Sequence, residues 1–268
     1  MYKLLLVTNQ TEVKDAYTSI PDMNRLMFEP IALADSAEAA IRFLNHPGAD
    51  AVAIDLDGAD ADSLRSHLDE HHPYMPIMRT HRRGDGLRNE LSLLREALDQ
   101  LHGDHSDYDY NPGLTMARLQ NEALHRLLEE RIANRDELIS RLMLSRSPIA
   151  ADRACLLFEF DLPDGANFLE TRWHHGFDRL DLALRANFFG QIAGPLAFTT
   201  ALISPLRLRV LACATAQISD SELDVLSSKA QRQVLEAAAQ VKDFMDLDLV
   251  CTQFRVLEQL DALIPTKQ

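Results

Sequence analysis

The chain has little that would support a disulfide framework or a phosphate-binding loop. Only three of its 268 residues are cysteines, and Cys155, Cys213 and Cys251 are odd in number, far apart and set among apolar neighbours. We therefore expect small buried side chains in a reducing compartment, with no metal bound by these cysteines. The ten glycines are scattered along the chain, which disfavours a glycine-rich loop that would cradle phosphates.

Basic charge is also scarce. Lysine and arginine number 27 against 41 aspartates and glutamates, which gives a formal net charge of −14. Because phosphate binding relies on clustered Lys and Arg, we expect no direct contact of this chain with nucleic acid. No run of eighteen apolar residues and no signal-peptide pattern is present, so the sequence predicts a cytoplasmic protein without a membrane segment.

What the chain does have is enough apolar residues, 46% of the total, for two modest domains. Residues 1–112 are expected to form the first. The stretch 49–57 contains a short apolar run that ends on Asp55, follows Pro47-Gly48 and precedes Gly58, as in a buried parallel strand. Asp55 would then lie at the carboxyl end of that strand, where open α/β sheets place their chemistry.

The remaining pattern of this domain alternates strands with helices. We expect strands at 2–7, 28–34, 49–55 and 74–80, with residues 107–112 in the place of a fifth. Helices are expected at 12–18, 36–45, 62–70 and 87–101, the second of them capped by Ser36. This order predicts an α/β domain of flavodoxin-like type with a five-stranded parallel sheet.

This order, with Asp55 after the third strand, resembles the receiver domain of two-component response regulators. The resemblance implies that Asp55 is the phospho-acceptor position. It also implies an acidic pair after the first strand that binds Mg²⁺, because phosphoryl transfer needs a cation at the developing charge. A Ser or Thr after the fourth strand and a Lys before a Pro after the fifth complete the family's site.

Several of these positions depart from the family pattern. Thr8 and Asn9 stand where the acidic pair is expected, and Asn111, before Pro112, stands where the Lys is expected. Thr80 matches the hydroxyl position, although the register could shift it to His81, and Asp57 is a second carboxylate beside Asp55. We therefore predict a pseudo-receiver that is not phosphorylated, with no cofactor, and with Mg²⁺ only if the receiver site is functional.

Residues 113–147 are predicted to connect two domains through one long helix at 114–144, which is rich in Leu, Glu, Arg and Ala. Such a helix would be about 45 Å long at the usual rise. Two interpretations are open. It pairs with its copy in a dimer as a signalling helix, or it packs on its own second domain, since Arg131 and Arg135 interrupt a heptad seam.

Residues 148–268 are predicted to form an α+β domain. Strands are expected at 153–160, 197–203 and 206–214, the last two joined as a hairpin at Ser204-Pro205. Helices are expected at 168–189, 219–245 and 249–263, and Ser219 with Glu222 should form a capping box at the second of them.

The segments Phe158-Glu159-Phe160-Asp161 and Arg172-Trp173-His174 resemble the divergent central domain of AraC-type response regulators, which is itself similar to nucleotide cyclases. Ser204-Pro205-Leu206 stands where diguanylate cyclases have a Gly-Gly-acidic turn, so we expect no enzyme activity. The adjacent pairs His71-His72 and His174-His175 are interpreted as surface or capping residues, since neighbours on a helix point about 100° apart.

Three functions follow as hypotheses. The first is a regulatory protein of the two-component type that acts through protein contacts, as an expected homodimer. The second is a DNA-binding transcription regulator without its DNA-binding end, because fewer than about 50 residues remain for a helix-turn-helix unit. The third is a degenerate cyclase-like enzyme or nucleotide-binding module in which Asp161 would bind the metal.

Overall fold

The computed structural model describes residues 1–81, 84–103, 111–188 and 194–265. The chain divides into two compact units. Unit 1 contains residues 1–120 and 140–147, and unit 2 contains residues 121–139 and 148–268. The chain therefore enters unit 2, returns to unit 1 for eight residues, and then completes unit 2.

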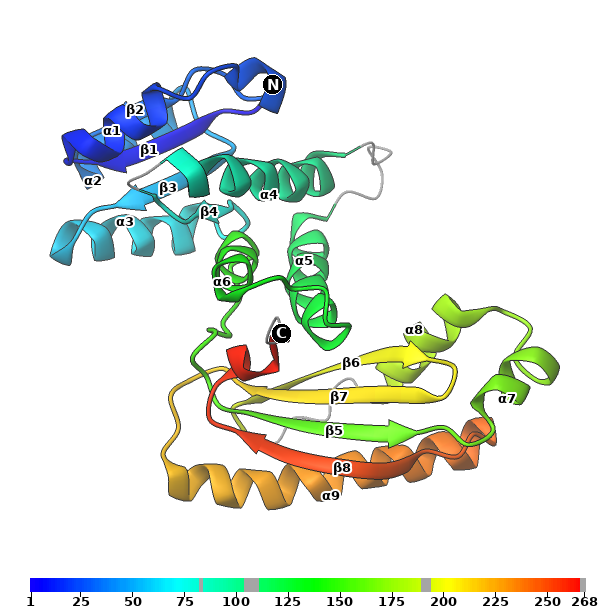
Figure 1. Cartoon of the computed structure of the whole chain (residues 1–268). Coiled ribbons are helices and arrows are strands. Elements are labelled where there is room, and N and C mark those ends of the chain that lie inside the picture. Colours follow the sequence, from blue (N-terminus) through cyan, green and yellow to red (C-terminus); the bar gives the residue numbers. More distant parts are fainter. Residues whose placement is uncertain (82–83, 104–110, 189–193, 266–268) are drawn as a thin grey trace. The chain divides into compact units, whose positions relative to one another are not determined.

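Unit 1 is built on a parallel sheet with the strand order β2-β1-β3-β4 (Figure 1). Its strands are β1 (Leu4–Thr8), β2 (Ala32–Ala34), β3 (Ala51–Asp55) and β4 (Ile77–Met78). Its helices are α1 (Thr11–Thr18), the 3₁₀ helix η1 (Met23–Leu26), α2 (Ala37–Asn45), α3 (Gly58–His71) and α4 (Gly84–His102). The alternation of strands and helices is as the sequence predicts, and Ser36 caps α2 by accepting a hydrogen bond from the backbone amide of Ala39.

Both faces of this sheet are buried, which explains why β1 is an unbroken apolar run. Leu4 and Leu6 pack on one face in a cluster with residues of α1 and α4. Leu5 and Val7 pack on the other face with residues of α2 and α3. Successive side chains of a strand point to opposite faces, so residues 4–7 of β1 all face a core and are all apolar.

The predicted fifth strand is not among the described strands, which number four in unit 1. Most of the segment 107–112 lies outside the described residues. Its last residue, Pro112, begins the helix α5 (Pro112–Leu128). The helix α4 shares a face with α1 rather than with α2 and α3, and right-handed crossovers that continue beyond β4 would put it with α3. The layout is thus α/β with a parallel sheet, and α4 closes the α1 face.

Unit 2 contains an antiparallel sheet with the strand order β6-β7-β5-β8 (Figure 1). The strands are β5 (Cys155–Asp161), β6 (Leu196–Ser204), β7 (Arg207–Ala214) and β8 (Val250–Leu257). The helices are α7 (Gly165–Thr171), α8 (Phe177–Phe188), α9 (Asp220–Met245) and the 3₁₀ helix η2 (Leu260–Leu263). The predicted hairpin of β6 and β7 and the capping box of Ser219 and Glu222 are confirmed.

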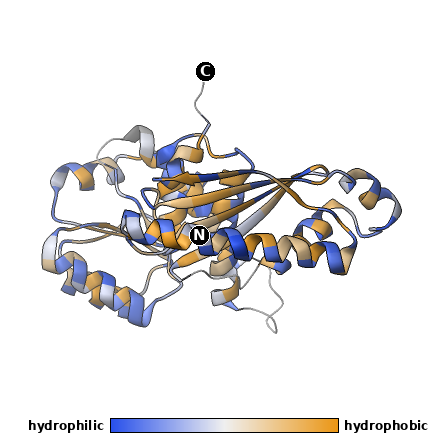
Figure 2. Ribbon diagram, turned by 90° about the horizontal axis from the view of Figure 1, so that it is seen from below, coloured by the Kyte–Doolittle hydropathy of each residue, from blue (hydrophilic) through white to orange (hydrophobic). Residues whose placement is uncertain are grey.

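One face of this sheet carries the larger core. Alternate residues of β5, including Phe158 and Phe160, pack with apolar residues of α8 and α9. Figure 2 shows the strands as largely hydrophobic, whereas the helices carry both hydrophilic and hydrophobic segments. The core face of α9 is made by small and β-branched residues, which are Ala230, Val234, Ala237, Ala238 and Val241.

The single connecting helix predicted at 114–144 is wrong. The chain forms α5, which ends at Leu128, and a second helix, α6 (Arg135–Leu144). Glu130 adopts a left-handed conformation with φ 61°, and the amides of Glu130 and Arg131 donate to the carbonyls of Leu127 and Arg126 at 3.1 and 2.8 Å. This is a Schellman ending, so the dimeric signalling helix loses its structural basis.

Two further predicted helices are wrong in unit 2. The segment 168–189 is broken into α7 and α8, with Gly176 at φ 83° between them. The segment 249–263 forms β8 and η2 instead of a helix. Val250 and Val256 are β-branched and favour the extended conformation in which they pair with Asp161 and Leu156 of β5.

Within the described residues, none of the helices combines the length and the apolar character that crossing a bilayer requires.

Candidate functional site

The carboxyl edge of the parallel sheet places Thr8 beside Asp55. These two residues end β1 and β3 and are direct partners in the register. The Thr8 hydroxyl donates to Asp55 Oδ2 at 2.7 Å and accepts from the Gln10 amide at 3.0 Å. Thr8 is fully buried and Asp55 half-buried. One carboxylate oxygen of Asp55 is therefore held by a neutral donor.

The other residues predicted around Asp55 are more open. Asn9 is exposed directly after β1. Asp57 is also exposed and precedes α3, but its side chain makes no capping hydrogen bond. Thr80 is half-buried two residues beyond β4. The predicted neighbours thus lie after the strand ends. Of these described residues, Thr8 is the one that forms a hydrogen bond with Asp55, at 2.7 Å.

A buried polar cluster in unit 1 was missed by the sequence interpretation. Glu90, on α4, is 4% exposed, and its Oε1 lies 3.0 Å from His81 Nε2 and also accepts from the Ser140 hydroxyl. Its other oxygen, Oε2, is buried without a hydrogen-bond partner among the described residues. The available signal was an acidic residue on the apolar face of α4, three positions after Leu87 and one before Leu91.

The phenol of Tyr17 is affected by the charges of both Glu90 and Asp55. Burial raises the pKa of the Tyr17 phenol, and the negative charges of Glu90 and Asp55 raise the pKa further. The phenol therefore stays neutral at physiological pH. Asp55 and Glu90 both influence the Tyr17 phenol, but Glu90 is already engaged by His81 and Ser140.

Asn111 is placed in a different setting. Its Oδ1 accepts from the Leu114 amide at 3.2 Å and its carbonyl accepts from the Thr115 hydroxyl, so it caps α5. A Cβ on Gly113 would lie 3.1 Å from the Tyr74 hydroxyl. Tyr74 precedes β4, whereas Asp55 lies where β3 ends. Asn111 is thus brought to the amino edge of the sheet and not to Asp55.

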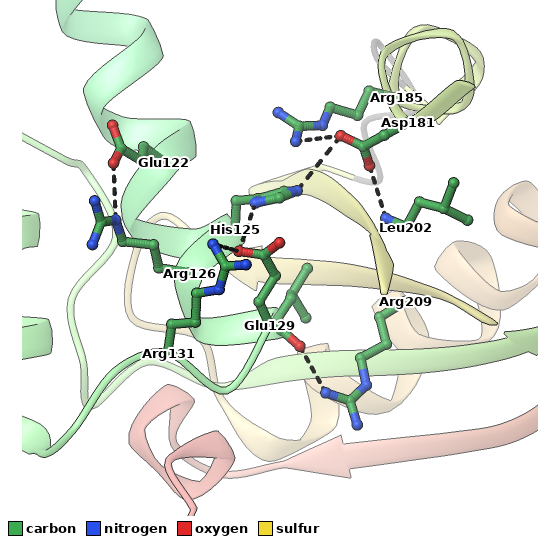
Figure 3. A network of polar contacts seen from close by, with 10 residues as sticks. Glu122, His125, Arg126, Glu129, Arg131, Asp181, Arg185, Leu202 and Arg209 are labelled. Carbon is green, nitrogen blue, oxygen red and sulfur yellow. Dashed lines mark hydrogen bonds and ion pairs between the residues drawn. The ribbon is translucent and has the colours of Figure 1, made fainter. Parts of the chain in front are cut away.

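Unit 2 has a polar network around His125, which Figure 3 shows between two carboxylates. His125 Nδ1 lies 3.4 Å from Glu129 Oε2 and Nε2 lies 3.6 Å from Asp181 Oδ2. Asp181 also pairs with Arg185 at 2.5 Å and accepts from the Leu202 amide at 2.8 Å. Because both ring nitrogens face carboxylates, the imidazole connects α5 to α8 rather than presenting a base to a substrate.

The environment of Asp181 favours its ionised form. Burial by itself raises the pKa of this carboxyl, but the interaction with His125, the hydrogen bond from the Leu202 amide and the charge of Arg185 outweigh burial. The pKa therefore lies below its usual value. The buried charge is compensated by its partners, as buried carboxylates require.

Two acidic residues of β5, Glu159 and Asp161, lie opposite arginines of β7. Glu159 Oε1 accepts from Arg209 Nε at 2.9 Å. Arg209 also donates to the Leu128 carbonyl at 2.7 Å and lies 2.8 Å from Glu130. Asp161 is exposed at the end of β5, opposite Arg207. A cation of the protein itself therefore sits beside the first acidic residue of this segment.

Neither protein-family models nor curated proteins give a match to this chain.

Proposed function

We propose that the chain is a regulatory protein whose receiver-like unit works without phosphorylation and signals through protein contacts. The observation that carries this proposal is the Thr8–Asp55 hydrogen bond at the carboxyl edge of the β2-β1-β3-β4 sheet. In receiver domains, the phospho-acceptor is a carboxylate at the carboxyl end of the third strand, which is where Asp55 lies. The hydroxyl beside it takes the place of a second carboxylate.

The chemistry of this edge supports that proposal. Mg²⁺ prefers near-octahedral oxygen ligands and usually takes one or two carboxylates together with waters. The residues around Asp55 offer one carboxylate bound by a donor, an exposed amide at Asn9 and the exposed Asp57. Glu90 is withdrawn by His81 and Ser140. Phosphoryl transfer depends on a cation at the equatorial oxygens. We therefore expect the residues around Asp55 to be poor catalysts of phosphoryl transfer.

The test is incubation of the full chain with millimolar Mg²⁺ and acetyl phosphate or beryllofluoride. We expect intact mass spectrometry to show no added phosphoryl group and amide NMR spectra to stay unchanged. Asp55→Asn is the matched control, because it keeps the acceptor of the Thr8 hydroxyl and removes the nucleophile. A Mg²⁺-dependent mass increase that Asp55→Asn abolishes would sink the proposal.

A gain-of-function variant sharpens the test. Asn9→Asp adds a carboxylate at an exposed position directly after β1, so its fold should tolerate the change. We expect Asn9→Asp to show Mg²⁺-dependent shifts at Asp55 that the natural chain lacks. Equal responses of both proteins would mean that the missing carboxylate is not what silences the site.

A further inference from the structure

Three imidazoles gather at the end of α3. His67 and His71 are four residues apart on this helix, and their ring centroids are 4.4 Å apart in an edge-to-face arrangement. His72 is the C-cap residue, and its ring lies 5.8 Å from that of His67. Residues four apart share one helix face, so His67 supplies the partner that the adjacent pair His71-His72 lacks.

The ring nitrogens of this group have unsatisfied bonding capacity. Nε2 of His67 and Nε2 of His72 are shielded from solvent and have no hydrogen-bond partner among the described residues. Buried polar atoms without a partner are uncommon in folded proteins.

We propose that His67 and His71 bind one divalent transition metal ion of the zinc class, with His72 as a third ligand. Two histidines four apart on a helix are a zinc-binding spacing, and imidazole suits Zn²⁺, Ni²⁺ and Cu²⁺ better than Mg²⁺ or Ca²⁺. Three donor side chains do not yet share one centre in the described residues. The site is therefore an open pair that a rotation of the His72 side chain completes, with water in the remaining positions.

The surroundings give an ion access to His71 and His72, two of the three residues of this group. His71 and His72 line a cleft of about 250 Å³ together with Asp50, Tyr74 and His102. His71 is exposed, and Asp69 beside it is paired with Arg146. The cleft carries one carboxylate and three imidazoles, which is compatible with an incoming cation.

This site is separate from the acceptor edge. α3 begins at Gly58, three residues after Asp55, and ends at His71. Its fourteen residues span about 20 Å at the usual rise. The metal site thus lies at the opposite end of α3 from Asp55 and does not depend on the proposed function.

The test is a calorimetric titration of the full chain with Zn²⁺, repeated with Co²⁺ while its visible absorption is recorded. We expect saturable binding of one ion per chain and a cobalt spectrum typical of nitrogen ligands. His67→Gln and His71→Gln should each weaken the affinity at least about tenfold, since each removes a direct ligand. His174→Gln, from an exposed adjacent pair outside α3, should leave the affinity unchanged.

The outcomes are distinguishable from one another. Equal Zn²⁺ affinity of the natural chain and the His67→Gln, His71→Gln double variant would overturn the proposal, and so would loss of binding in Asp55→Asn. Because His71 is exposed, His71→Gln should fold, and circular dichroism checks this. Paramagnetic shifts from Co²⁺ should centre on the end of α3 rather than on Asp55, and a centre elsewhere would also refute the assignment.

Discussion

At the scale of single residues, Asp181 is a carboxylate with three different kinds of partner. It accepts from a backbone amide and pairs with an imidazole and a guanidinium. Removing one member of such a group leaves the others without their counter-charge, which costs more than the pair contributes when intact. The network therefore fixes α8 against α5 and β6.

Asp181→Asn should lower the free energy of unfolding by about 2 kcal/mol at neutral pH, at the low end for buried ion pairs because the site is partly solvated. The pKa of Asp181 is depressed in the folded chain from its ordinary value of 3.8. Its stabilising charge is thus fully present above that value and is lost as the pH falls through the depressed pKa. Urea titrations at neutral and acidic pH should show the difference from the natural chain narrowing only in acid.

The exposed Asp224 on α9 provides the control, since Asp224→Asn should change stability by no more than about 0.5 kcal/mol. A pH-independent deficit in Asp181→Asn would show that packing, and not the charge, is what the substitution removes.

At the scale of elements, two glycines show different reasons for their place in the fold. A Cβ on Gly165, at the start of α7, would lie 1.9 Å from the carbonyl oxygen of Pro205 in the β6–β7 turn. A Cβ on Gly176 would meet nothing within 4 Å, but its φ is 83°. The first glycine is required by a close approach and the second by backbone conformation.

Gly165→Ala should therefore lower the free energy of unfolding by about 3 kcal/mol, because backbone must move in both α7 and the turn. Gly176→Ala should cost only about 1 kcal/mol, the usual cost of a left-handed conformation for a residue with a Cβ. Chemical denaturation of the two variants side by side measures the difference. Equal losses would mean that the β6–β7 turn yields easily to the added methyl group.

The elements of both units could be predicted where one pattern dominates. β1 and β3 are apolar runs buried on both faces, and the capping box of Ser219 and Glu222 marks the start of α9. β8 was mistaken for a helix because its apolar residues fit a helical period, and pairing with β5 decides between the two. The left-handed Glu130 carries no glycine signal.

The candidate site was predictable only in part, because some of its contacts join residues that are far apart in the sequence. Asp55 and Thr8 follow from the strand ends, since register places them together. The bonds of Glu90 to His81 and Ser140 join residues up to 50 positions apart, and no local pattern specifies such a contact. The predicted location of Asn111 was wrong because we expected a fifth strand to end beside Asp55, whereas Asn111 caps α5.

At the scale of the whole molecule, the division of the chain determines which fragments can fold. Residues 121–139 belong to unit 2 although they precede residues 140–147 of unit 1. Leu127 and Leu128 lie next to Leu157 of the sheet, and Arg209 bonds the Leu128 carbonyl. A boundary drawn at residue 148 therefore uncovers one face of the antiparallel sheet.

A fragment of residues 121–268 should be markedly more stable than one of residues 148–268. Losing the burial of Leu127 and Leu128 alone should cost about 4 kcal/mol, and Arg209 loses its partners in the segment 128–130. Thermal unfolding followed by circular dichroism, together with size-exclusion chromatography, would compare the two. Similar melting temperatures would mean that residues 121–139 are not part of the second core.

The interleaving of the two units has a consequence for synthesis on the ribosome. Leu144 packs in the core of unit 1 with residues of β1, β3 and α4, yet it is translated after residues 121–139 of unit 2. Domains generally fold in order from the amino terminus as they emerge. Here the first unit stays incomplete until residue 147 has left the exit tunnel. By then residues 121–139 of the second unit have already emerged, before the sheet on which they pack has been synthesised.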